Sequence, residues 1–226
     1  MAGVFVTGTG TDVGKTFVTA ALARHFRSLG QPVEALKPIV SGFDPKNVSS
    51  SDPAMLLTAL ERPSTIDEIE RISPWRFSAP LSPDLAAQME GTTIPFSNLV
   101  AFSRDAIRTD GMTFIEGVGG IMVPLDDTHT VLDWMSALSM PVLLVAGSYL
   151  GTISHTLTAI QVLTARDLDI AGVVVSESPI PGASLAETAA SIRRFAPSLH
   201  VVELSRIGPG SAPPSEVMSQ IAHLLS

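Results

Sequence analysis

The sequence predicts an α/β fold built on a mostly parallel, doubly wound sheet with helices on both faces. The first observation is that short apolar runs rich in β-branched residues alternate with helix-compatible runs along the whole chain. The second is composition: 45% of the 226 residues are hydrophobic and only 16% are charged, which suits strands buried on both sides. Because no linker-like stretch divides the chain, we expect residues 1–226 to form one domain.

The expected elements alternate along the chain. Strands are expected at 4–6, 33–40, 112–116, 141–147, 170–175 and 200–204, and helices at 17–29, from 52 onward, at 83–90, 95–108, 151–166 and 186–195, with a last helix ending at 225. Residues 74–83 contain three prolines, so we expect an ordered loop there, near the site or a subunit contact, and not a helix or central strand. Residues 208–214 are rich in Gly and Pro and are expected to turn.

The first strand runs into a glycine-bearing loop that ends in Gly14-Lys15-Thr16 and continues as a helix. This order is typical of a phosphate-binding loop, in which backbone N–H groups and the helix N-terminus cradle an anion. Lys15 is then expected to reach the β- and γ-phosphates and the Thr16 hydroxyl to bind Mg²⁺. Five residues separate Gly8 from Gly14 where the usual pattern has four, so the loop is a variant, and the alternative is a glycine-rich turn with a chance Gly-Lys-Thr.

Three more polar residues stand where an open α/β sheet binds ligands. Lys37 lies near the end of an expected strand, although a solvated edge lysine is the alternative. Asp52 starts a helix and is either a ligand or a simple cap. Glu116 ends a strand before a Gly-Val-Gly-Gly run, where phosphate-loop proteins hold Mg²⁺; if buried it needs a metal or lysine partner, and otherwise it is an exposed strand-end acid.

Composition also excludes several classes of function. A net charge of −8 argues against a large nucleic-acid footprint, and the absence of cysteine removes disulfides, thiolate metal sites and thiol nucleophiles. No apolar run is long enough for a membrane span or a signal-peptide core, so we expect a cytoplasmic protein without membrane partners. His155 stands at a helix start, where a structural role is the more common one.

These motifs together resemble the dethiobiotin synthetase family, a biotin-pathway branch of the phosphate-loop NTPases. The resemblance covers most of the chain and rests on Gly8 to Thr16, Lys37-Pro38 with Ser41-Gly42, Ser51-Asp52, Glu116 to Gly120 and Leu150 to His155. It implies an ATP- and Mg²⁺-dependent ligase that closes a cyclic urea on 7,8-diaminononanoate with CO₂. It also implies a homodimer whose substrate pocket crosses the interface.

The resemblance further implies a role for each matching residue. Lys37, Lys15 and Thr11 are expected to be catalytic, and Thr16, Asp52 and Glu116 to bind Mg²⁺. The substrate is expected at Thr11, Lys37 and Ser41 of one subunit and at Gly151, Thr152, Ile153 and Ser154 of the other. The nucleotide is expected at Asp12, Val13, Gly14, Lys15, Thr16, Phe17, Asp52, Glu116, Gly117, Val118, Gly119, Ser176, Glu177, Leu204, Ser205 and Arg206.

The chain departs from the family pattern at three places. Ser176 stands where an adenine-reading asparagine is familiar, Ser154 where asparagine is often found, and Leu204 to Arg206 lacks a Pro-Trp pair. We therefore expect a nucleotide site that also accepts triphosphates other than ATP.

Two related classes remain as alternatives. Amidoligase relatives carry a glutaminase with a cysteine nucleophile, which this chain lacks, and partition-type ATPases carry a second lysine at the position of Gly10.

Overall fold

A computed structural model describes residues 3–208 and 212–225. Its centre is a six-stranded sheet in the order β2-β5-β1-β6-β7-β8, and every neighbouring pair is parallel. The strands are β1 (Gly3–Gly8), β2 (Val33–Leu36), β5 (Met112–Glu116), β6 (Val142–Ala146), β7 (Ile170–Ser176) and β8 (Val201–Leu204). The predicted fold class is confirmed.

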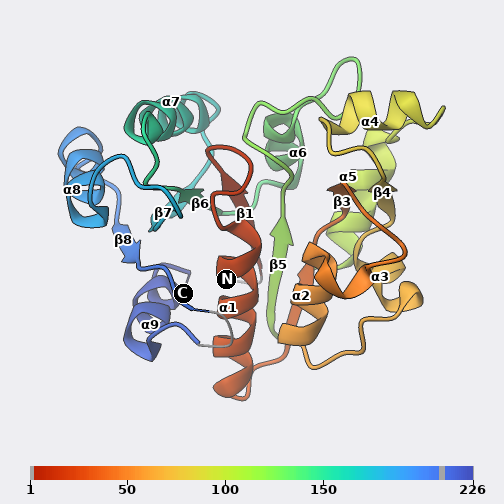
Figure 1. Cartoon of the computed structure of the whole chain (residues 1–226), viewed down its shortest axis with the longest axis horizontal. Helices are drawn as coiled ribbons and strands as arrows, with labels where there is room; N and C mark the ends of the chain where they lie inside the picture. The colour runs from red at the N-terminus through yellow and green to blue at the C-terminus, as the bar shows by residue number, and fades with distance from the viewer. Residues whose placement is uncertain (1–2, 209–211, 226) are drawn as a thin grey trace.

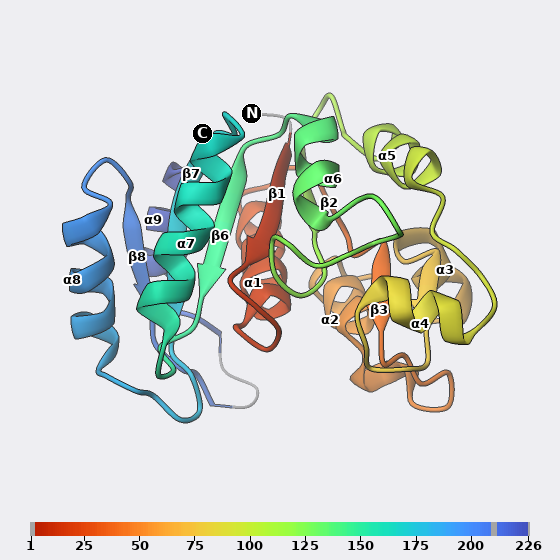
Figure 2. The same cartoon turned by 90° about the horizontal axis from the view of Figure 1, so that it is seen from above.

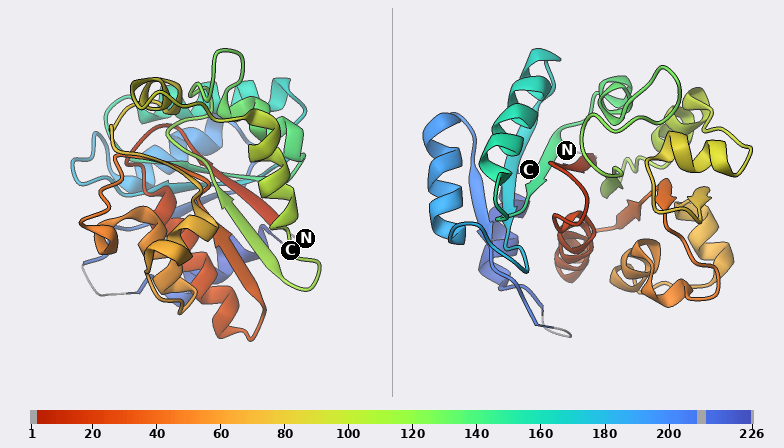
Figure 3. Two further views of the ribbon diagram at one scale, coloured as in Figure 1. Left: turned by 90° about the vertical axis from the view of Figure 1, so that its right-hand side faces the viewer. Right: turned by 45° about the horizontal axis from the view of Figure 1, so that its top comes forward.

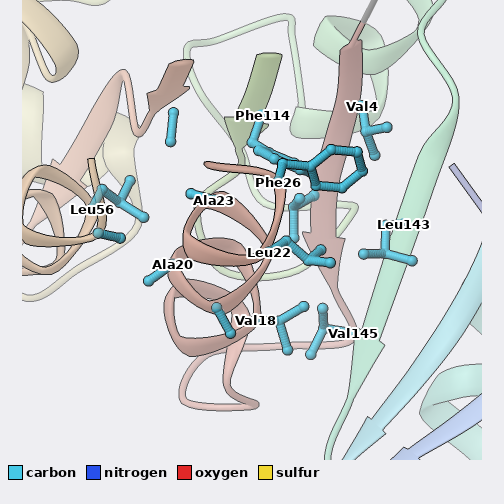
Figure 4. Packing of buried hydrophobic residues seen from close by; sticks show 14 of the residues in the cluster. Val4, Val18, Ala20, Leu22, Ala23, Phe26, Leu56, Phe114, Leu143 and Val145 are labelled. Atoms are coloured by element: carbon cyan, nitrogen blue, oxygen red, sulfur yellow. The ribbon is translucent and has the colours of Figure 1, made fainter. Parts of the chain in front are cut away.

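Helices cover both faces of this sheet (Figures 1 and 2). One face carries α1 (Lys15–Ser28), α2 (Asp52–Ala59) and α9 (Ser215–His223), and the other carries α5 (Phe96–Asp105), α6 (Val131–Leu138), α7 (Thr152–Ala165) and α8 (Leu185–Phe195). The period-2 alternation of β1 explains how one strand serves two cores: Val4 and Val6 join the α1 cluster, while Phe5 joins the α6 cluster. Figure 4 shows Leu22 and Phe26 of α1 packed over the sheet beside Phe114.

The topology creates a switch point at β1. From β1 the chain crosses through α1 to β2 at one edge, whereas β5 leads through α6 to β6 on the other side of β1. Ligands bind at such switch points, outside the carboxyl ends of the strands. The register pairs Val6 of β1 with Glu116 of β5, so Glu116 lies next to the start of the phosphate loop.

A second, two-stranded sheet lies beyond the β2 edge, and it corrects two expectations. The single strand expected at 33–40 is two strands, β2 and β3 (Ile39–Ser41), and β3 pairs with β4 (Trp75–Phe77) inside the segment expected to be only a loop. Pro38 has no N–H for the main sheet, and the backbone N–H of Lys37 donates instead to Ile72. The orange and yellow segments of Figure 3 show this part, which also holds η1 (Val48–Ser50), α3 (Ile66–Ile72) and α4 (Pro83–Met89).

Other boundaries differ by a few residues. α1 begins at Lys15, earlier than expected, and the helix expected at 95–108 ends at Asp105. The turn expected at 208–214 falls partly on residues 209–211, outside the described residues. Within the described residues, no helix combines the length and the apolar character needed to cross a membrane.

The helix α6 was not expected from the sequence, and its N-terminus is held by a capping box. The Asp133 carboxylate accepts hydrogen bonds from the Thr130 N–H and hydroxyl, and Arg166 lies 3.3 Å away. Partial burial raises the pKa of Asp133, but the bonds from Thr130 and Arg166 outweigh it and hold the pKa below its ordinary value.

We expect Asp133→Ala to lower the free energy of unfolding at pH 7 by about 1 kcal/mol, because a helix cap is lost. A carboxyl whose pKa is lowered by folding stabilises above its unfolded pKa and loses that effect as the pH falls through its folded pKa. The difference between wild type and variant should therefore shrink below about pH 4. Urea unfolding at pH 7 and pH 3 measures it, with the exposed Asp127→Ala as control. An equal difference at both pH values would contradict the cap.

Candidate active site

The phosphate loop wraps around the side chain of Lys15. Asp12 and Gly14 both have positive φ angles, 57° and 95°, which turn the chain tightly into α1. The buried Lys15 ammonium donates a 2.7 Å hydrogen bond to the Gly10 carbonyl. A Cβ at Gly8 would lie 3.0 Å from the Lys15 side chain, so glycine allows the close approach.

A cluster of polar side chains from different elements lies beside this loop. Glu116, at the end of β5, is fully buried, and its Oε1 accepts hydrogen bonds from Thr16 Oγ1 at 2.6 Å and from Lys37 Nζ at 2.9 Å. Lys37 Nζ also lies 3.2 Å from Thr16 Oγ1 and forms an ion pair with Asp52 of α2. The buried Glu116 thus has the lysine partner that its burial requires, and Asp52 does more than cap a helix, since Ser51 is the N-cap.

The two lysines have opposite electrostatic environments. Burial, together with the nearby Lys37 charge, lowers the pKa of Lys15 to about 8. Burial also lowers the pKa of Lys37, but the carboxylates of Glu116 and Asp52 outweigh it, so the pKa of Lys37 is raised above its ordinary value. Lys37 is therefore a fixed positive charge. The carboxylates near Lys15 do not offset the effects of burial and of Lys37, so a bound anion would stabilise the charged form of Lys15.

The same cluster fits a magnesium ion by its donor chemistry. Within the described residues, Glu116 Oε2 is buried without a hydrogen-bond partner, and Thr16 and Asp52 add a hydroxyl and a carboxylate. Mg²⁺ takes oxygen ligands and usually keeps waters or phosphate oxygens besides one or two carboxylates. No group of three or more His, Cys, Asp or Glu side chains suited to a metal occurs in residues 3–208 and 212–225, so this site would depend on such additional ligands.

Two cavities meet at the phosphate loop. One, of about 680 Å³, lies on the side of Lys37 and is bordered by Thr11, Lys15, Thr16, Lys37, Ser41, Asp52, Val118, Gly119 and the segment 80–83. The proline-rich segment therefore does lie near the site. The Ser41 Oγ is buried there without a hydrogen-bond partner among the described residues.

The other cavity, of about 240 Å³, lies on the opposite side of the loop and is bordered by Asp12, Val13, Gly14, Phe17, Ser176, Glu177, Ser205 and Arg206. It shares Asp12, Gly14 and Phe17 with the first cavity. A Cβ at Gly14 would lie 2.8 Å from the Ser176 Oγ, so the serine side chain lies directly against the phosphate loop.

Several expected site residues lie elsewhere. The Leu204 side chain is buried in the core beside α9, and Gly117 packs against Phe5 and Val131, so neither borders the two cavities. Gly151 to Ser154 form the start of α7, where Ile153 and Ser154 border a shallow groove on the outer face of the helix. The Thr152 hydroxyl is buried and donates to the Gly147 carbonyl, and the Thr152 backbone N–H donates to the Tyr149 carbonyl at 3.1 Å.

Sequence reasoning missed a pair of serines that joins two loops. The Ser148 N–H donates to Ser178 Oγ at 2.9 Å, and the Ser178 N–H donates to Ser148 Oγ at 3.0 Å. Each serine follows its strand, β6 or β7, by two residues, and these strands are neighbours. That equal offset is the signal that could have found the pair.

The fold and the loop define a phosphate-loop nucleotide-binding protein, and residues 2–211 match the family model described as an AAA domain. The chain is similar to proteins named ATP-dependent dethiobiotin synthetase BioD. It is 52% identical to that of Caulobacter sp. (strain K31), over 86% of this chain and 84% of the relative. It is 48% identical to that of Caulobacter vibrioides (strain NA1000 / CB15N), over 92% of this chain and 94% of the relative. It belongs to the dethiobiotin synthetase family and is an ATP-dependent ligase.

A solved structure supports the fold alone. Chloroplast FtsY from Physcomitrella patens superposes with a TM-score of 0.53 at 15% identity, covering 99% of this chain. This chain spans 65% of that protein.

Proposed function

We propose that this enzyme uses ATP, Mg²⁺ and CO₂ to carboxylate 7,8-diaminononanoate and close its urea ring, giving dethiobiotin, ADP and phosphate. The observation that carries the proposal is the cavity beside the phosphate loop. It is bordered by two buried lysines and by the Ser41 hydroxyl, for which the described part of the chain offers no hydrogen-bond partner. The names of the relatives point to the same product.

In this proposal one amine of the substrate attacks CO₂ to form a carbamate, whose oxygen then accepts the γ-phosphate as ADP leaves. The second amine attacks the resulting carbamic-phosphoric anhydride and releases phosphate. Each step places negative charge on oxygen, so positioning and fixed positive charge can carry the reaction without a covalent enzyme intermediate.

The residues divide this work by position. Lys15 holds the β- and γ-phosphates, Lys37 bridges the carbamate and the γ-phosphate, and Thr11 and Ser41 contact the substrate. Thr16, Asp52 and Glu116 hold Mg²⁺, which when bound neutralises charge on the phosphate oxygens.

The proposed enzyme is a homodimer in which Gly151 to Ser154 of the partner subunit receive the substrate carboxylate. The support is that the start of α7 lies outside both cavities and that Leu150 beside it is 87% exposed. A helix N-terminus favours an anion.

Sedimentation is expected to show a homodimer, and Leu150→Glu is expected to shift it toward monomer, because a charge replaces an exposed apolar side chain at the interface. Leu29→Glu, at an exposed apolar position after α1, is the control and should leave the mass unchanged. A fully active monomer at nanomolar concentration would refute the dimer.

Mass spectrometry tests the reaction itself. Dethiobiotin should form from diaminononanoate, bicarbonate, Mg²⁺ and ATP, and omission of any one component should remove it. Nucleotide hydrolysis that ignores the diamine and responds to DNA or membrane would instead favour a partition-type switch.

A further inference from the structure

The smaller cavity contains a carboxylate that is fixed in place from two sides. The Glu177 backbone N–H donates to the Leu204 carbonyl at 2.9 Å, and Glu177 Oε2 accepts a 2.9 Å hydrogen bond from the Arg206 N–H. These bonds tie the loop after β7 to the loop after β8. One carboxylate oxygen is therefore occupied by the protein, while the group as a whole borders the cavity.

Two serine hydroxyls flank Glu177 in the chain. The Ser178 hydroxyl accepts from the Ser148 N–H, and the Ser176 Oγ lies against Gly14, within 2.8 Å of where a Cβ would be. Among residues 176–179, Glu177 alone has a charged side chain, and it borders the cavity. An ionised carboxylate only accepts hydrogen bonds, so it attracts amino groups and repels carbonyl oxygens.

We propose that Glu177 accepts a hydrogen bond from the exocyclic amino group of the nucleotide base, so that the enzyme selects amino-bearing bases and rejects uracil. The inference rests on the proposed function, in which the phosphates lie on Gly14 to Thr16. Both cavities share Gly14, so a nucleotide whose phosphates lie on this loop has one cavity on each side. Its transferred phosphate would face the cavity of Lys37, and its base would enter the cavity of Glu177.

This selection refines the permissive site expected from Ser176. Adenine and cytosine both present an amino group to an acceptor, and acidic side chains are known partners of the cytosine amino group. A site built to bond a polar group discriminates strongly against an analogue that lacks it, because its own group is then left unpaired.

The first measurement compares ADP with purine riboside diphosphate by calorimetry, since these differ only by replacement of the amino group with hydrogen. The wild type should bind ADP about 10- to 100-fold more tightly, the range for a hydrogen bond to a charged group. The ratio of kcat/KM for ATP to kcat/KM for purine riboside triphosphate should match this ratio of affinities. Among ATP, CTP, GTP and UTP, UTP should be the poorest substrate.

The second measurement uses Glu177→Gln. Its amide oxygen can keep the bond from the Arg206 N–H, which leaves the amide nitrogen, a donor, toward the base. IDP carries a carbonyl in place of the amino group. The ratio of the ADP affinity to the IDP affinity should be lower in the variant than in the wild type by about tenfold or more. Glu203→Gln is the matched control, because Glu203 of β8 pairs with Arg193 of α8 and does not border the cavity.

The possible results test the role of Glu177 separately from the proposed reaction. Equal wild-type affinity for ADP and purine riboside diphosphate would overturn it, as would a Glu177→Gln variant that is stably folded and keeps the wild-type ratio. Base selection that depends on Glu177 in a protein that makes no dethiobiotin would support the inference and overturn the proposed function.

Discussion

Replacing Lys15 by alanine is expected to remove most nucleotide binding and to lower turnover by about 10²-fold or more, the usual effect of deleting a group that stabilises charge in the transition state. The buried ammonium has no substitute at the loop, since Lys37 is engaged by Glu116 and Asp52. Calorimetry with ADP and steady-state product formation measure the two effects.

Lys46→Ala is the matched control, because Lys46 is exposed on a loop and borders neither cavity. Thermal unfolding must accompany the assay, since Lys15 also bonds the Gly10 carbonyl within the loop. Wild-type turnover in a folded Lys15→Ala protein would remove the basis of the proposed nucleotide site.

Lys37→Gln is expected to leave ADP affinity nearly unchanged and to lower dethiobiotin formation by about 10²-fold or more, because its charge acts on the carbamate and the transferred phosphate. The same change should destabilise the fold. Glu116 is fully buried and loses its counter-charge, and removing one partner of a buried ion pair costs about 3–5 kcal/mol.

A double variant separates these two effects. Lys37→Gln combined with Glu116→Gln removes the uncompensated charge, so urea unfolding should show stability recovered, whereas product formation should stay low. Mg²⁺ should stabilise Lys37→Gln more than wild type, because a cation that binds the folded state replaces the missing charge. Recovery of both stability and activity in the double variant would make Lys37 a purely structural residue.

The sequence predicted most of what depends on short stretches of chain. The phosphate loop needs only its own strand, glycines and helix, and Glu116 was readable as the end of an apolar strand. What failed depends on neighbours in space. The strand expected at 33–40 breaks because Pro38 cannot bond in the main sheet. The missed helix α6 is a different case, because its capping box and the helical spacing of its apolar residues are local signals that the sequence does contain.

The site shows the same division. Lys37 and Glu116 lie together because the neighbouring strands β2 and β5 end at the same edge, and the resemblance added Asp52 at the start of α2. The ion pairs among the three depend on side-chain rotamers. The Leu204 side chain points into the core because strand alternation puts it there. The expectation that Leu204 contacts the nucleotide came from its position in the family motif, and such a match does not tell which face of the strand a side chain occupies.

The reciprocal bonds between Ser148 and Ser178 have a mechanical consequence. They connect the loop that contains Glu177 with the loop that precedes α7. A third hydrogen bond between the same loops runs from the Gly182 N–H to the Ser148 carbonyl at 2.8 Å. The Gly182 backbone also presses so closely on Leu150 that a Cβ would lie 2.6 Å from it. A continuous set of contacts therefore connects the smaller cavity, which Ser178 borders, with Leu150, which is exposed on the surface of the protein.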